Sequence, residues 1–141
     1  MAKLITTLAV VALAGFAAAQ LDKAKFMEIF NKCQSQINVD TSEIELMKNK
    51  EAPTSDKGKC LIACIMEEGG IIKDGKYSLD GSIAMAEAKF SGNADNLAVA
   101  KDAVQKCQGE AEAANAANKC DLALEIAKCF KKYAGSIEEP F

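Results

Sequence analysis

Six cysteines limit what this chain of 141 residues can fold into more than any other feature. They are Cys33, Cys60, Cys64, Cys107, Cys120 and Cys129. In a short secreted chain, an even number of cysteines implies a disulfide framework, but the count does not choose among the many pairings. A metal site is disfavoured because the chain has no C-x-x-C pair and no histidine. We therefore expect three disulfides, no metal and no cofactor.

The first 19 residues have the three parts of a secretory signal peptide. Lys3 carries a positive charge, residues 4–14 are apolar residues and threonines, and small residues end at Ala17-Ala18-Ala19. A membrane anchor is the alternative, but spanning a bilayer takes about 20 apolar residues and this run is shorter. We predict cleavage after Ala19, secretion, and a single domain over residues 20–141.

The charge of the predicted mature chain argues against nucleic acid as a partner. Without residues 1–19 the chain has 16 lysines against 20 acidic residues, a net charge of −4, and it has no arginine. Nucleic-acid binding requires clustered cations, whereas these charges are interspersed as on a solvated surface. No basic amphipathic face is present, so we also expect no stable membrane association.

Apolar residues recur at helical spacing along almost the whole mature chain and predict about six helices. The stripes are Phe26, Phe30, Cys33 and Ile37; Ile44 and Met47; Ile83, Ala86 and Phe90; Leu97, Ala100, Val104 and Cys107; and Leu122, Ile126, Phe130 and Tyr133. Alternation of period two is nearly absent, so no sheet is expected. Residues 109–118 could form a loop or extend the sixth helix, and the pattern leaves both open.

Short motifs predict where some helices begin and end. Ser42 and Glu45 form a capping-box pattern that would start the second helix, and Pro53 would stop it. The third helix, from about residue 58 to 68, ends at Gly69-Gly70. Asp74-Gly75 then predicts a turn.

The spacing of the cysteines predicts a cross-braced bundle. The intervals between successive cysteines are 26, 3, 42, 12 and 8 residues. On a helix, Cys60 and Cys64 lie on the same face one turn apart and can reach two different neighbours. Cys120 and Cys129 point to opposite faces, so the sixth helix can be tied on both sides.

The pattern C-x26-C-x3-C-x42-C-x12-C-x8-C resembles the six-cysteine signature of the insect pheromone- and general odorant-binding family. The intervals of three and eight are the most diagnostic features of that family. The segments 60–64 and 127–130, and the turn from Gly70 to Tyr77, are also similar. The resemblance covers the whole mature chain and includes the preceding signal peptide. It implies an all-α bundle around an internal apolar cavity that carries small apolar molecules.

The resemblance also implies a disulfide pairing, which the helical geometry allows but does not select. The pairs would be Cys33–Cys64, Cys60–Cys120 and Cys107–Cys129. Such bracing suits a hollow bundle, because lost packing around a cavity costs about 2–5 kcal/mol per large-to-small change. Disulfides that close long loops offset this by about 2–4 kcal/mol each.

Ten residues are candidates for ligand binding, some from the resemblance and some from the apolar stripes. They are Met66, Ile71, Tyr77, Ile83, Phe90, Leu97, Ile126, Phe130, Tyr133 and Phe141. The plain alternative is that they fill an ordinary core, as apolar helical stripes usually do.

The type of ligand follows from one departure from the family pattern. Some members bind short alcohols through hydroxyl side chains at the positions that match Met66 and Ile71, both apolar here. We therefore expect a drier pocket that favours long aliphatic or aromatic ligands. Tyr77 and Tyr133 remain candidates for one orienting hydrogen bond.

The tail after Cys129 is too short, at 12 residues, to insert a helix into the pocket. It is either a frayed terminus or a lid in which Ile137 and Phe141 cover the cavity mouth. The chain has no histidine, the usual switch between pH 5 and 8. Acid release would have to use carboxylates such as Glu138 or Glu139, so pH dependence near neutrality should be weak.

Other classes of function fit less well. An enzyme is not expected, because histidine, free cysteine, G-x-S-x-G and a glycine-rich phosphate loop are all missing. A saposin-like lipid module is a rival, but its cysteine spacing differs. A non-olfactory secreted carrier with the same fold is the main alternative. An olfactory receptor is a candidate partner, and we expect a monomer or a weak homodimer.

Overall fold

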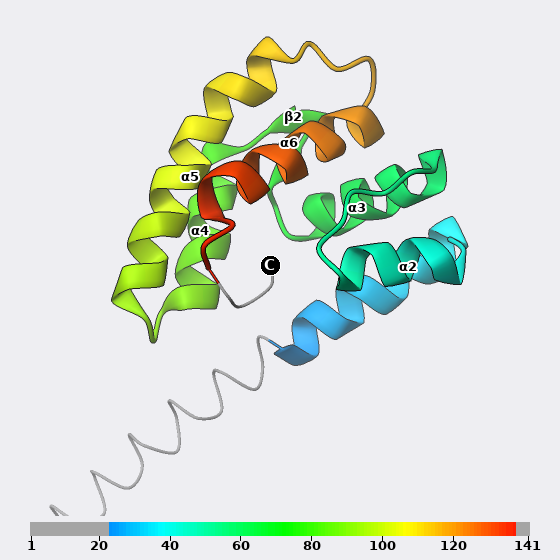
Figure 1. The fold of residues 1–141 in the computed structure, drawn as a ribbon, viewed down its shortest axis with the longest axis horizontal. Coiled ribbons are helices and arrows are strands. Elements are labelled where there is room, and N and C mark those ends of the chain that lie inside the picture. Colours follow the sequence, from blue (N-terminus) through cyan, green and yellow to red (C-terminus); the bar gives the residue numbers. More distant parts are fainter. Residues whose placement is uncertain (1–22, 138–141) are drawn as a thin grey trace, which may run out of the picture.

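The computed structural model describes residues 23–137, which form an all-α bundle as predicted (Figure 1). The predicted signal peptide, Glu138, Glu139 and Phe141 lie outside the described residues. A helix over residues 23–37 comes first. It is followed by α2 (Thr41–Lys48), α3 (Asp56–Glu68), α4 (Leu79–Phe90), α5 (Ala94–Ala113) and α6 (Lys119–Ala134).

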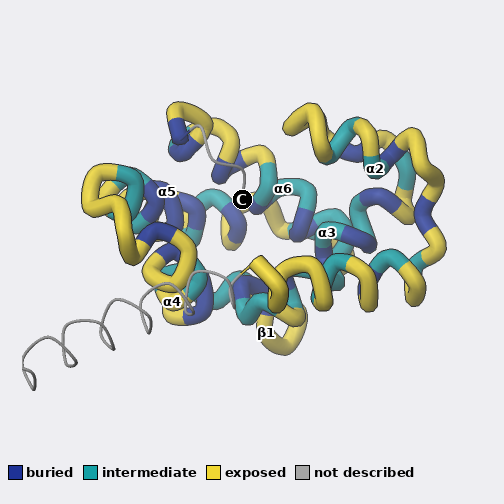
Figure 2. Tube along the Cα trace, turned by 90° about the horizontal axis from the view of Figure 1, so that it is seen from below, coloured by how far each residue is buried: buried dark blue, intermediate teal, exposed yellow. Residues whose placement is uncertain are grey.

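Helix α6 lies at the centre of the arrangement. It packs against α5 on one side and α3 on the other, while α4 packs against α5 (Figure 1). Buried and exposed stretches alternate along the helices (Figure 2), as expected when one face of each helix lies on a core. The stripes at 3.6-residue spacing therefore mark the core-facing sides, except at the start of the first helix, where Phe26 is 43% exposed.

The expectation of no sheet was wrong at one place. After α3, β1 (Ile72–Lys73) pairs antiparallel with β2 (Lys76–Tyr77). The predicted turn between them is confirmed, since Asp74 and Gly75 both have positive φ, 52° and 73°. Two residues with positive φ form the tight connection that a hairpin requires. Strands of two residues are too short to show alternation, so periodicity could not reveal them.

The predicted capping box of the second helix was also wrong. Helix α2 begins at Thr41 with Asp40 as its N-cap, and the Asp40 side chain makes no capping hydrogen bond. Ser42 therefore lies inside the helix. The helix ends at Lys48, before Pro53. The end of α3 is confirmed, with Gly69 as its C-cap.

The segment 109–118 is a loop only in its second part, and it does not extend the sixth helix. Its first part extends the fifth helix, since α5 runs to Ala113, and its second part is the connection to α6. Alanine and glutamate favour helix, which accounts for the extension. Asn118 then caps α6, because its side-chain oxygen accepts hydrogen bonds from the backbone N–H groups of Cys120 and Asp121.

Three disulfides brace the bundle with the pairing that the resemblance implied. Cys33–Cys64 ties the N-terminal helix to α3, Cys60–Cys120 ties α3 to α6, and Cys107–Cys129 ties α5 to α6. Helix α6 is held on both sides, as the nine-residue step between its cysteines predicts.

A contact between two glycines fixes the start of α4. Gly70 has a φ of +80°, which lets the chain turn sharply after α3. A Cβ on Gly81 would collide with the Gly70 carbonyl, so the first turn of α4 lies directly on this corner. The neighbouring Ser82 is thereby placed in the interior, with 2% of its surface exposed.

Candidate functional site: the apolar interior

The buried apolar side chains form three clusters. The first cluster joins α3, β1, α5 and α6, and its members are Ala63, Met66, Ile71, Ile72, Val104, Cys107, Ala111, Leu122, Ala123, Ile126, Cys129 and Phe130. The second cluster lies between α4, α5 and the end of α6, and consists of Ala86, Phe90, Ala100, Ala103, Ala134 and Ile137. The third cluster, Cys33, Val39 and Leu61, joins the N-terminal helix to α3.

The structure brings nine of the ten candidate ligand-binding residues into or against the first two clusters. Met66, Ile71, Ile126 and Phe130 are members of the first cluster, and Tyr77, Ile83 and Tyr133 pack against it. Phe90 is a member of the second cluster, and Leu97 packs against it together with Tyr133. Phe141 lies outside the described residues. Whether these side chains contact a ligand stays a prediction.

Tyr77 links the hairpin to α5 and α6. Its ring meets Phe130 edge to face with a centroid distance of 6.3 Å. Its hydroxyl donates a hydrogen bond of 2.7 Å to the Val104 carbonyl. Burial raises the pKa of Tyr77, and the nearby Ser82 hydroxyl lowers it by less. The phenol is therefore neutral at physiological pH, and it donates its proton to the backbone carbonyl of Val104.

Tyr133, the other tyrosine considered for an orienting hydrogen bond, is half-buried and bonded to a charged side chain. Its hydroxyl lies 2.5 Å from Glu110 Oε1. The ammonium groups of Lys106 and Lys132 lie 5.1 and 4.7 Å from its ring centroid. The hydrogen bond from Tyr133, followed by that from Lys132, lowers the pKa of Glu110. Tyr77 is therefore the better placed of the two tyrosines to orient a ligand.

Ser82 is a buried polar residue that sequence reasoning missed. The buried face of α4 consists of Gly81, Ser82, Ala86 and Phe90, whereas Ile83 is only partly buried. The predicted stripe began at Ile83 because that residue is apolar. Ser82 lies four residues before Ala86 and eight before Phe90, which is the spacing that could have placed it on the same face.

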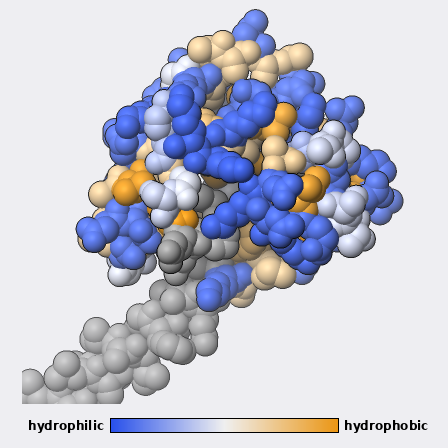
Figure 3. Space-filling view, viewed as in Figure 1, coloured by the Kyte–Doolittle hydropathy of each residue, from blue (hydrophilic) through white to orange (hydrophobic). Residues whose placement is uncertain are grey.

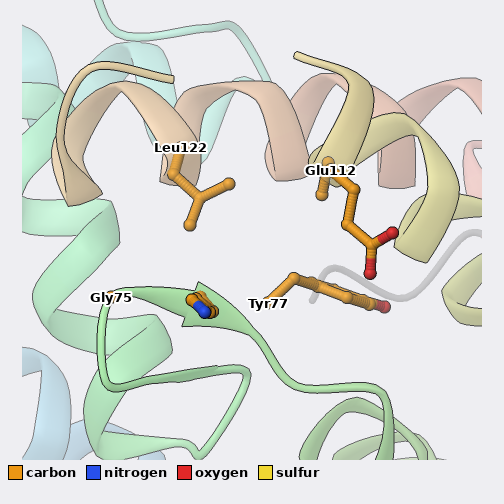
Figure 4. Close-up of a pocket in the computed structure, with 6 residues that line it drawn as sticks. Gly75, Tyr77, Glu112 and Leu122 are labelled. Atoms are coloured by element: carbon orange, nitrogen blue, oxygen red, sulfur yellow. The ribbon is translucent and has the colours of Figure 1, made fainter. Parts of the chain in front are cut away.

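Two of the hollows among the described residues bear on the site. The smaller, about 160 Å³, lies between the hairpin and the facing parts of α5 and α6. Figure 4 shows Leu122 pointing from α6 toward the hairpin, with the Glu112 carboxylate near the Tyr77 ring. The lining residues of this smaller hollow are Gly75, Lys76, Tyr77, Ala111, Glu112 and Leu122. This volume is below the roughly 300–1,000 Å³ of ordinary ligand sites.

The larger hollow, about 500 Å³, is polar and lies where α3 and α6 begin. It is lined by Asp56, Lys59, Cys60, Asn118, Cys120 and Asp121. Lys59 Nζ lies 3.2 Å from Asp121 Oδ1 and 3.5 Å from Asp56 Oδ1. Asp121 is the main cause of the raised pKa of Lys59. This charged lining does not suit an apolar ligand.

Most of the face seen in Figure 3 is hydrophilic. On the face in Figure 3, apolar residues occur in small separate patches. Across residues 23–137, no group of three or more metal-ligating side chains is placed to hold an ion. Within the same range, no helix combines the length and apolarity needed to cross a membrane.

Comparison with known proteins identifies the family. The model of the PBP/GOBP family matches residues 17–133. The chain belongs to this family. A curated relative, general odorant-binding protein 19d of Drosophila melanogaster, is 21% identical to this chain. The alignment covers 85% of this chain and 81% of the relative. General odorant-binding protein 28a of the same species is 32% identical over 50% of this chain and 49% of its own.

Solved structures of the same type share the fold. Odorant binding protein 5 of Apis mellifera superposes with a TM-score of 0.73 at 19% identity, covering 87% of this chain and 95% of that one. A fatty acid binding protein, OBP56a, from the oral disk of the blowfly Phormia regina has a TM-score of 0.59 at 26% identity, covering 82% and 94%. Membership of this family implies that the protein binds small hydrophobic ligands. The family consists of carriers, and its members are secreted.

Proposed function

We propose that this protein is an extracellular carrier that binds small hydrophobic molecules in its apolar interior and transports them. One observation carries the proposal. Side chains from α3, the hairpin, α4, α5 and α6 converge in the first and second clusters, and nine of the ten residues proposed for the ligand lie in or against these clusters. Cys60–Cys120 and Cys107–Cys129 tie α3 and α5 to α6, so this frame keeps its arrangement when a guest enters.

The ligand class that we propose is a long aliphatic or aromatic molecule. Met66 and Ile71 are both apolar and buried, so this wall offers no hydroxyl clamp for a short alcohol. The Phormia regina protein, which shares the fold, is a fatty acid binding protein, and this supports a long aliphatic chain as guest. Met66 and the partly buried Met85 are flexible and can adapt to such a chain.

The proposal extends to secretion and to the partner. The predicted signal peptide would direct the chain to secretion into a body fluid, which would be either sensillum lymph or a non-olfactory fluid. An olfactory receptor is the partner in the first case, and the chain acts as a monomer or weak homodimer. No catalytic role is proposed.

Binding of the fluorescent apolar probe N-phenyl-1-naphthylamine, and its displacement by long-chain aliphatic competitors, tests the carrier function. Met66→Thr changes the first cluster, and Met47→Thr is the matched control because Met47 packs against the third cluster. We expect the first variant to weaken probe binding severalfold and the second to leave it unchanged, with both folded by circular dichroism. Absence of probe binding to the wild type would contradict the carrier function, and vesicle leakage without ligand retention would favour a saposin-like module.

A further inference from the structure

Ser82 carries an unused hydrogen-bonding group in the interior. Its side chain is 98% buried, since only 2% of its surface is exposed. Its hydroxyl oxygen finds no hydrogen-bond partner among residues 23–137. A buried polar group without a partner costs free energy, so such groups are rare and call for an explanation. A bound molecule that completes the bonding of Ser82 would provide one.

The Tyr77 hydroxyl lies near enough to Ser82 for the Ser82 hydroxyl to lower the pKa of Tyr77, although no hydrogen bond joins them by distance and angle. Tyr77 therefore determines what such a molecule must offer. The Tyr77 proton is donated to the Val104 carbonyl at 2.7 Å, which leaves only lone pairs on the Tyr77 oxygen. The Ser82 hydroxyl, in contrast, can both donate and accept. The pair therefore presents one acceptor and one group that can donate.

Hydroxyl groups match this pair better than other oxygens do. A guest hydroxyl can donate its proton to Tyr77 and accept the proton of Ser82 at the same time. An aldehyde oxygen can accept from Ser82 but has nothing to donate to Tyr77. An ether oxygen can likewise accept from Ser82 but has no proton to donate to Tyr77.

The surroundings of the pair fit a long apolar chain. Ser82 continues along α4 into Ala86 and Phe90 of the second cluster. The Tyr77 ring rests on Phe130 of the first cluster. A guest whose oxygen lies at Ser82 would thus extend its chain along the junction of the two clusters.

We propose that Ser82 and Tyr77 form a polar anchor for the terminal hydroxyl of a long-chain aliphatic alcohol bound in the interior. This inference rests on the proposed carrier function. It places the anchor on α4 and the hairpin, on residues other than Met66 and Ile71.

Displacement of N-phenyl-1-naphthylamine by three guests of equal length tests the anchor: 1-dodecanol, dodecanal and 1-methoxyundecane. One net hydrogen bond corresponds to a preference of roughly 2- to 10-fold. We expect the wild type to prefer the alcohol over the ether by about this factor. In Ser82→Ala the preference should fall to about one, while the affinity for the probe is kept.

Ser91→Ala is the matched control, because Ser91 is an exposed serine at the end of the same helix. It should keep the wild-type preference. Ser82→Cys preserves the volume and weakens the donor, and should give an intermediate preference. Because Ser82 has no partner to lose, we expect its variants to melt at or above the wild-type temperature.

The outcomes separate the two proposals. Probe binding without any preference in the wild type overturns the anchor alone. A preference for the alcohol that survives in Ser82→Ala also overturns the anchor. Equal binding of all three guests by the wild type would indicate that a water molecule, and not the guest, bonds to Ser82. Failure of the wild type to bind the probe overturns the carrier function and the anchor together.

Discussion

Glu43 shows how a single buried carboxylate organises the connection between α2 and α3. Its side chain is 4% exposed and accepts hydrogen bonds from the Thr54 hydroxyl at 2.6 Å and the Ser55 backbone N–H at 2.9 Å. Ser55 in turn caps α3 through the Gly58 backbone N–H. The hydrogen bond from Thr54 lowers the pKa of Glu43 and outweighs the effect of burial, which raises it.

Glu43→Gln should lower the melting temperature near neutral pH. The folded-state pKa of Glu43 lies below the ordinary value of 4.5, so its stabilisation is present above that value and is lost as pH falls through the folded pKa. Melting curves at pH 7 and pH 3 measure the effect. The exposed Glu45→Gln is the control and should change little. An equal loss for Glu43→Gln at both pH values would contradict the charge-dependent role.

Tyr77→Phe should reduce the free energy of unfolding by about 1 kcal/mol, the typical net value of one hydrogen bond. The variant loses only the hydroxyl that donates to the Val104 carbonyl, and the ring contact with Phe130 remains. Urea denaturation measures the change. Tyr133→Phe removes a hydroxyl bonded to Glu110, whose side chain is 40% exposed, and should cost less because water can replace the lost partner. The reverse order of the two variants would be incompatible with this assignment.

The residue scale also shows what sequence could reveal of the site. Apolar stripes placed Phe90, Ile126 and Phe130 in the interior correctly, because helical burial follows spacing. They missed Ser82, since a polar side chain gives no signal in an apolar stripe. They could not separate Tyr77 from Tyr133, because the partners Val104 and Glu110 are set by tertiary packing.

At the scale of elements, the disulfides differ in how far their cysteines are exposed to solvent. Cys60 and Cys120 are partly buried and line the polar hollow where α3 and α6 begin. Cys107 and Cys129 are 0% and 3% exposed and belong to the first cluster. Access governs how fast a thiolate attacks a disulfide.

Limited reduction of the folded protein should therefore open Cys60–Cys120 before Cys107–Cys129. Trapping with an alkylating agent and peptide mass spectrometry would identify the first labelled cysteines. In urea, where the protein is unfolded and both disulfides are exposed, the two pairs should be reduced at similar rates. Faster labelling of Cys107 and Cys129 in the folded protein would contradict the buried position of that pair.

The elements themselves were predictable to different degrees. The helices could be predicted from the sequence, because each helix buries one face over several turns and so gives a periodic apolar pattern. The hairpin could not, because its strands have two residues each and depend on the turn at Asp74 and Gly75. The capping pattern at Ser42 failed because α2 begins one residue earlier, at Thr41 with Asp40 as its N-cap, which places Ser42 inside the helix. The disulfide pairing came from the family resemblance, as spacing alone allowed other pairs.

On the scale of the whole molecule, the titratable groups with shifted pKa values all move away from neutrality. The pKa values of Glu43 and Glu110 are lowered. Those of Tyr77, Lys59 and Lys106 are raised. The chain has no histidine. These groups keep their charge state between pH 7 and pH 6.

Ligand affinity should consequently change less than about twofold between pH 7 and pH 6, since no side chain of this chain titrates there without a large pKa shift. Probe-binding curves at both pH values, with ionic strength held constant, measure this. A sharp loss of affinity at pH 6 would require a titrating group that the structure does not account for.

The tail contributes to the second cluster as far as it is described. Ile137 is 4% exposed and packs with Phe90 and Ala134, so the chain is anchored up to this residue rather than frayed. The predicted role of Phe141 as part of a lid stays a prediction. The interior enclosed in this way is where a guest must reside if the protein is a carrier.

Native mass spectrometry of the protein purified from its source, followed by extraction and identification of the bound molecule, tests the carrier function most directly. We predict a mature chain that begins at Gln20, contains three disulfides and carries one small apolar molecule. Recovery of no apolar molecule, together with no displacement of the fluorescent probe, would contradict it.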